Sequence, residues 1–191
     1  MNPPAIAAIF AVGVVTLVVA FVLVTTYNAI VALRQRSDKA WSNIDVVLKQ
    51  RHDQLPNLVS AVRGLMAYEQ GVLTRVTEAR AAYSPTAPIP EQAATSEATT
   101  AAVRNLFAVV ERYPDLKSAE NVRDLQTQIE RLEDMIADRR ELYNDQIYRY
   151  NTRIGQLPGV LIAPLFGWHS REFFTADEVD TVRPDADLRT T

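Results

Sequence analysis

The hydrophobic pattern of the chain changes sharply near Leu33, because no charged side chain precedes Arg34. Residues 5–24 are almost wholly apolar, and about 20 helical residues at 1.5 Å each span roughly 30 Å, the hydrocarbon thickness of a bilayer. This run predicts a membrane anchor over residues 1–26. A cleaved signal peptide is the alternative, but it begins with basic residues and has an apolar core of only about 7 to 15 residues, so the uncleaved anchor is favoured.

Apolar residues recur at helical spacing immediately after this run. Their spacing over residues 28–54 predicts that the first helix continues from the membrane into the domain. Pro56 is expected to end this helix, since proline removes a backbone donor and clashes with the preceding turn. A second helix is predicted over residues 57–83, with Asn57 as its N-cap.

Two further helices are predicted in the second half of the chain. The prolines over residues 84–90 are incompatible with helix and predict an exposed loop. A helix over residues 95–112 follows, and the longest soluble helix is expected over residues 118–153 with Ser118 as its cap. No segment shows the alternation that is typical of a strand.

Amphipathic helices joined by short connections must cover one another's apolar faces. We therefore predict an all-α fold, in which the N-terminal transmembrane helix continues into an antiparallel bundle of about four helices over residues 27–157. Apolar residues recur at intervals of seven along the longest helix, a pattern that also describes coiled coils. A coiled-coil dimer is therefore the alternative to the favoured monomeric bundle.

The chain changes character after the bundle. Residues 158–176 form an apolar and aromatic arm broken by prolines, and residues 177–191 form an acidic tail whose composition predicts disorder. The arm either packs over the end of the bundle, which we favour, or inserts Phe166 and Trp168 into the membrane interface, where aromatic side chains are favoured.

The distribution of charge predicts the orientation of the anchor. Arg34 and Arg36 follow the apolar run and no basic side chain precedes it, so the positive-inside tendency places the N-terminus outside and the helical domain in the cytoplasm. These arginines and Tyr27 are the residues expected at the membrane interface beside the anchor.

The net charge of −3 arises from Arg171 onward, where six acidic residues face three arginines. The acidic and basic residues of the bundle therefore balance, and the bundle lacks the net positive charge that favours binding of nucleic acid.

Candidate chemistry is sparse. The chain has no cysteine, which excludes disulfides and thiolate sites, and its only two histidines, His52 and His169, lie far apart in the sequence. No metal site, cofactor or nucleophile motif is predicted. Arg51, His52 and Asp53 could in principle perform acid–base chemistry, but a cap and ion-pair cluster near the Pro56 turn is the favoured interpretation. An enzyme acting on a membrane-proximal substrate is thus the least favoured function.

Glu69 and Arg139 each replace an apolar residue on a core-facing stripe. We predict that they pair inside the bundle, where the loss of one partner would cost roughly 3 to 5 kcal/mol. The carboxylates of Glu130, Glu133 and Asp134 on the longest helix are instead assigned to a solvated face, paired with neighbouring arginines.

The dipeptide Tyr-Asn occurs at residues 27–28, 143–144 and 150–151, and the last two copies are a heptad apart. Tyrosines on a core stripe are usually core residues with the hydroxyl at the edge. The alternative is a peptide-binding groove lined by these pairs.

Three segments resemble the LemA family of bacterial membrane proteins. The sequence AWSNIDVVLKQRHDQLPNLV over residues 40–59 closely resembles the signature of the family. ERYPDLKSAENVRDLQ from Glu111 and RRELYNDQIYRYNTRIGQLPGVLIA from Arg139 resemble its central segment and its last helix with the following turn.

The candidate interaction or structural residues are Trp41, Asn43, Asp45, Arg51, His52, Asp53, Pro56, Asn57, Glu69, Arg139, Tyr143, Asn144, Tyr150 and Asn151.

The resemblance implies an N-terminal anchor, a cytoplasmic helical bundle, no established enzymatic activity, and kinship with proteins that organise bacterial membranes, including magnetosome formation. We expect a binding or scaffold module at the cytoplasmic (inner) membrane, and a membrane-remodelling or self-assembling protein is the alternative. The expected partners are the lipid bilayer, an unidentified membrane or cytoplasmic protein, and further copies of the same chain in a homo-oligomer.

Overall fold

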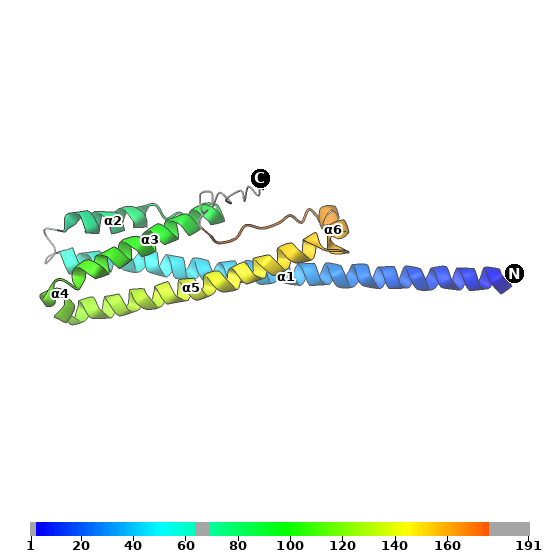
Figure 1. Ribbon diagram of the computed structural model, residues 1–191, viewed down its shortest axis with the longest axis horizontal. Helices are drawn as coiled ribbons and strands as arrows, with labels where there is room; N and C mark the ends of the chain where they lie inside the picture. Colours follow the sequence, from blue (N-terminus) through cyan, green and yellow to red (C-terminus); the bar gives the residue numbers. More distant parts are fainter. Residues whose placement is uncertain (1–2, 64–68, 176–191) are drawn as a thin grey trace, which may run out of the picture.

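A single helix carries the chain from the apolar run into the folded domain. The computed structural model describes residues 3–63 and 69–175, and its first element, α1, is one continuous helix over Pro3–Arg63. The N-terminal part of α1 projects well beyond the other helices (Figure 1). It is long and apolar enough to cross a membrane, and only 6% of its most apolar window is buried against protein. A core helix of a water-soluble protein would bury this surface, so α1 has the features of a membrane span.

The remaining helices pack beside the C-terminal half of α1. They are α2 (Gln70–Ala81), α3 (Ile89–Val110), the short α4 (Pro114–Ser118) and α5 (Glu120–Gly155). α5 pairs closely with α1, while α2 and α3 pair with each other (Figure 1). Over the two described ranges the chain contains no strand. The predicted all-α class, with an N-terminal apolar helix that continues into a bundle, is confirmed.

Pro56 does not end α1, contrary to the sequence prediction. A proline inside a helix leaves the carbonyl four residues earlier without its usual donor, which here is the carbonyl of His52. The guanidinium Nε of Arg80, on α2, donates a hydrogen bond to this oxygen over 3.1 Å. A long-range contact therefore compensates the lost backbone bond, and α1 continues to Arg63.

Three other predicted boundaries were wrong. The helix expected over residues 57–83 is divided, since α1 ends at Arg63 and α2 begins at Gln70. α3 begins at Ile89, earlier than expected, because Pro90 occupies the first helical turn, where no backbone donor is required. Ser118 belongs to α4, and its hydroxyl donates to the carbonyl of Asp115 rather than capping α5.

The bundle has one main hydrophobic core and a smaller one near the membrane span. The heptad stripe of α5, represented by Ile129, Ile136 and Tyr143, is buried in the main core, which α1, α2 and α3 also line. The smaller core forms where α6 (Gly159–Ile162) and the 3-10 helix η1 (Ala163–Phe166) fold back against α1 and α5. Because α1 covers the stripe of α5 within one chain, the heptads are explained by the intramolecular bundle.

Candidate functional site

A buried arginine joins three helices in the middle of the bundle. Arg51 on α1 is only 3% exposed. Its Nη1 donates to Glu133 Oε1 on α5 over 2.8 Å and to Thr100 Oγ1 on α3 over 3.0 Å. Its Nη2 donates to Ser96 Oγ over 2.9 Å and to the Ser96 carbonyl over 3.3 Å. The Thr100 hydroxyl in turn donates to Glu133 Oε2 over 2.6 Å.

This network links α1, α3 and α5 through paired polar groups. An arginine does not release its proton in proteins, and the carboxylate of Glu133 accepts a hydrogen bond at each oxygen. The prediction that Glu133 belongs to a solvated face was wrong, because its partner lies on another helix far away in the sequence.

The neighbours of Arg51 in the sequence lie apart from this network. His52 is partly exposed, its Nδ1 lies 3.1 Å from the exposed carboxylate of Asp53, and its ring packs 5.3 Å from that of Tyr83. Burial, and then the nearby carboxylate of Asp45, raise the pKa of Tyr83 to about 12. The predicted cluster of Arg51, His52 and Asp53 is thus divided between core and surface, and no helix end is present there to be capped.

The predicted pairing of Glu69 with Arg139 is also wrong. Glu69 Oε1 lies 3.4 Å from Arg112 Nη2, whereas Arg139 donates from Nη1 to the backbone carbonyl of Asn43 over 3.1 Å. Asn57 does not act as an N-cap, since it lies within α1. The break between α1 and α2 changes the helical register on which the pairing was based.

Two asparagines on α5 clamp the extended C-terminal arm by its backbone. Asn151 accepts from the Arg171 N–H and donates to the Arg171 carbonyl, both over 2.9 Å. Asn144 makes the same pair of bonds to Phe174, over 2.8 and 3.4 Å. Seven helical residues rise about 10.5 Å and three extended residues rise about 10 Å, so the heptad spacing of the asparagines matches the spacing of the clamped residues.

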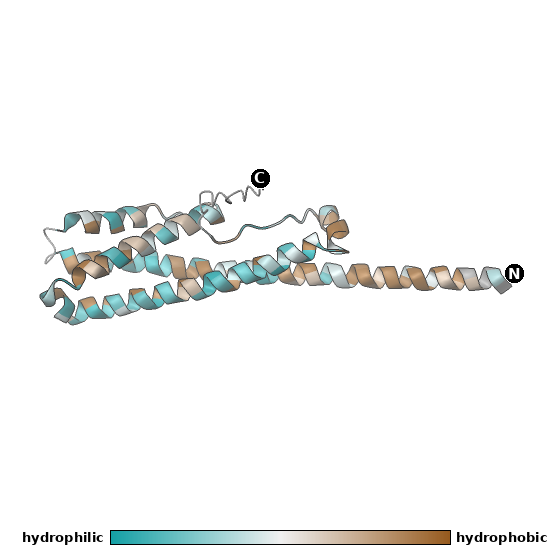
Figure 2. Ribbon diagram, in the orientation of Figure 1, coloured by the Kyte–Doolittle hydropathy of each residue, from teal (hydrophilic) through white to brown (hydrophobic). Residues whose placement is uncertain are grey.

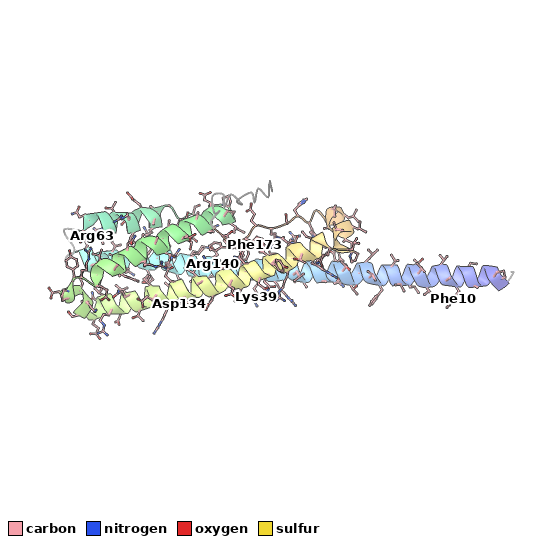
Figure 3. All side chains as sticks on the ribbon, viewed as in Figure 1. Phe10, Lys39, Arg63, Asp134, Arg140 and Phe173 are labelled. Atoms are coloured by element: carbon pink, nitrogen blue, oxygen red, sulfur yellow. The ribbon has the colours of Figure 1, made fainter. Side chains whose placement is uncertain are left out.

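The tyrosines beside these asparagines complete the contact. The hydroxyl of Tyr143 donates to the Glu172 carbonyl over 3.0 Å, and the guanidinium of Arg171 lies 5.4 Å from the centre of the Tyr150 ring. Burial raises the pKa of Tyr143 to about 12. In Figure 3 the arm, on which Phe173 is labelled, runs alongside α5.

Residues of α1 form the opposite wall of this groove. Asp38 pairs with Arg171 over 2.7 Å, and the Trp41 ring lies 5.6 Å from that of Tyr143 and 5.9 Å from that of Phe174, which is buried. The Tyr-Asn pairs of α5 thus line a groove for an extended segment, and the chain's own arm fills it.

Comparison with known proteins assigns the fold to a family. The LemA family model matches residues 40–187, which include most of the chain after the apolar run. The chain belongs to the LemA family. The similar proteins include magnetosome proteins MamQ 1 and MamQ 2 of Paramagnetospirillum magneticum. Each is 26% identical, and each match covers 82% of this chain and 68% of the relative. Magnetosome protein MamQ of Magnetospirillum gryphiswaldense is also 26% identical, and its match covers 86% of this chain and 70% of the relative.

The LemA-like segments correspond to distinct parts of the structure. Residues 40–59 lie within α1 and contribute Arg51, and the segment from Glu111 forms the α3–α4–α5 connection. The segment from Arg139 carries the asparagine clamp and enters α6. The LemA-like segments therefore include Arg51 of the buried network and the α5 residues that clamp the arm.

Aromatic residues join the arm to the end of the apolar span. The Tyr27 ring lies 4.8 Å from that of Phe166 and 5.3 Å from that of Trp168. Trp168 is buried, whereas Phe166 is exposed and Arg34 and Arg36 are exposed farther along α1.

Sequence reasoning missed the exposed leucines that follow α5, which are Leu157, Leu161 and Leu165, although their spacing of four residues was a usable signal. The predicted tail over residues 177–191 lies outside the described residues.

Proposed function

We propose that this protein is a membrane-anchored, non-enzymatic scaffold that holds a helical bundle at the cytoplasmic face of a bacterial inner membrane and recruits or organises proteins there. The unbroken α1 carries the proposal. A membrane span and a bundle that share one continuous helix have a fixed geometry, whereas a flexible linker would let the domain sample many orientations. Membership of the LemA family and similarity to magnetosome proteins support a membrane-associated role.

The flanking charges support the cytoplasmic orientation. Arg34, Arg36 and Lys39 are exposed on α1 within the turns that follow the apolar span, and basic residues beside a span favour the cytoplasmic side.

The described residues contain no group of His, Cys, Asp and Glu with the geometry to hold a metal ion. The polar groups of the Arg51 network hydrogen-bond to one another. This mutual pairing supports the non-enzymatic proposal.

A shallow groove between α1 and α5 supports the recruitment of a partner. Its volume is about 280 Å³, and Arg36, Lys39 and Arg139 contribute cations to its lining. Leu142, also in this lining, is 61% exposed. An exposed leucine among cations suits a protein surface that offers an apolar contact and acidic side chains.

Cross-linking in native membranes tests this function. Full-length protein and a version with a substituted membrane span would be cross-linked, purified in mild detergent and analysed by mass spectrometry. We expect both versions to retain one stoichiometric partner. Leu142→Glu should reduce its recovery, and Tyr148→Glu, at an exposed aromatic on another face of α5, should not.

Two results would contradict recruitment. Absence of any partner or self-link would refute a scaffold role in this membrane. Recovery of self-links alone would favour the alternative, a self-assembling protein that organises the membrane, for which the exposed apolar segment after α5 is the supporting observation.

A further inference from the structure

A short segment after α5 exposes an unusual density of large apolar side chains. We call residues 157–166, which include α6 and η1, the apolar foot. Its exposed side chains are Leu157, Val160, Leu161, Leu165 and Phe166. We propose that the apolar foot is a second membrane contact, which inserts into the boundary between lipid headgroups and acyl chains beside the anchor. This inference rests on the proposed membrane anchoring and adds a surface with the bilayer as its partner.

The apolar foot lies beside the C-terminal end of the apolar run of α1. A hollow of about 350 Å³ separates it from α1 and is lined by Leu23, Val24, Tyr27, Ile162, Leu165 and Phe166. Arg34 lies about seven helical residues beyond Tyr27, or roughly 10 Å farther from the span. Figure 2 shows hydrophobic colouring on α6 and on the adjoining part of α1. The apolar surface of the span thus continues sideways onto the foot.

The foot cannot turn its exposed side chains inward, because its other face is already packed. Ile162 and Ala163 are buried with Ile30 of α1 and Tyr150 of α5 in the smaller core. The rings of Tyr27, Phe166 and Trp168 pack together at the other end of the foot. One side of the foot therefore fixes it to the bundle, while Leu165 remains 79% exposed.

The surroundings of the foot favour the bilayer surface as its binding partner. Its apolar side is continuous with a helix that is itself a candidate span. Arg153, in the last turn of α5, lies four residues before the first residue of the foot, and Arg34 lies on α1. Apolar side chains bordered by cations are the pattern of interfacial membrane contacts, where the cations meet anionic headgroups.

A second contact would change what the anchor can do. A single span can tilt in the bilayer, but a second contact on one side of α1 limits the tilt of the bundle. The groove around Leu142 would then keep a more constant direction relative to the bilayer, which favours recruitment of a partner.

Depth measurements on the full-length chain test this proposal. The chain has no cysteine, so single cysteines at Leu161, Leu165, Leu17 or Ala94 would each carry an environment-sensitive fluorophore in vesicles of phosphatidylcholine and phosphatidylglycerol. Quenchers would be spin labels at defined depths on lipid chains, and iodide in the water. Leu17 lies in the span and Ala94 is exposed on α3.

We expect shallow lipid quenchers to quench the labels at Leu161 and Leu165, and iodide to quench them several-fold less than the label at Ala94. Iodide quenching at both foot positions as strong as at Ala94, with Leu17 still quenched by lipid, would overturn the foot and leave the anchor intact. Iodide quenching at Leu17 would instead contradict the anchoring itself. Two foot positions are used so that damage by one label does not decide the result.

Discussion

Removing the negative partner of the buried arginine should strongly destabilise the bundle. In Glu133→Gln the side chain keeps its size and one acceptor oxygen, but the guanidinium of Arg51, only 3% exposed, loses its compensating charge. Breaking a buried pair from one side costs about 3 to 5 kcal/mol. A domain of this size has a total stability of about 5 to 15 kcal/mol, so this single change should remove a large share of it.

The opposite substitution should cost less, because the two partners are not equally buried. In Arg51→Met the carboxylate of Glu133 keeps the hydrogen bond from Thr100, and its side chain is 20% exposed, so water can reach it. We expect a loss of about 1 to 3 kcal/mol, the cost of an incompletely satisfied polar group. The double variant Arg51→Met with Glu133→Leu should be more stable than Glu133→Gln alone, because no uncompensated charge remains.

Urea unfolding of the full-length protein in mild detergent, followed by helical circular dichroism, would measure these losses. The matched control is Arg149→Met, which breaks an exposed pair with Asp145 on a single helix and should cost less than about 1 kcal/mol. The buried pair is refuted as described if Glu133→Gln costs no more than this control, or if the double variant is no more stable than Glu133→Gln alone.

Three further changes test other parts of the structure. Asn144→Ala and Asn151→Ala each remove two hydrogen bonds to the arm, so limited proteolysis should cut the arm faster, and unchanged cutting would contradict the clamp. Raising the pH from 10 to about 12 should destabilise the fold, because burial raises the pKa of Tyr143 to about 12 and only the folded state retains that proton; Tyr143→Phe should weaken this pH dependence in alkaline unfolding curves, and Tyr148→Phe should leave it unchanged. Gly159→Ala should lower the melting temperature, because its Cβ would overlap a backbone carbonyl at the end of α5.

Helix periodicity was sufficient to predict the class and the existence of α5. The stripe through Ile129, Ile136 and Tyr143 is both regular and buried, so local pattern and tertiary packing agree. Pro56 was misjudged because the rule for proline considers only the local helix, whereas the donor that rescues the carbonyl comes from Arg80 on α2.

The candidate site could be predicted only in part. The Tyr-Asn repeat is visible in the sequence, but its meaning depends on an arm about 20 to 30 residues later whose backbone carries no sequence signal. Glu133 resembles any acidic residue on a polar helix face, and only the folded bundle places it against Arg51. Long-range pairing of this kind leaves no local pattern to read.

The topology of the anchor is the most direct test of the proposed membrane anchoring. Single cysteines at Pro4, near the start of α1, and at Ser42, exposed on α1 beyond the span, would be labelled with a membrane-impermeant maleimide in spheroplasts. We predict membrane-bound protein in which Pro4→Cys is labelled at once and Ser42→Cys only after the membrane is permeabilised. Immediate labelling of Ser42→Cys, or recovery of the full-length chain in the soluble fraction, would contradict this prediction.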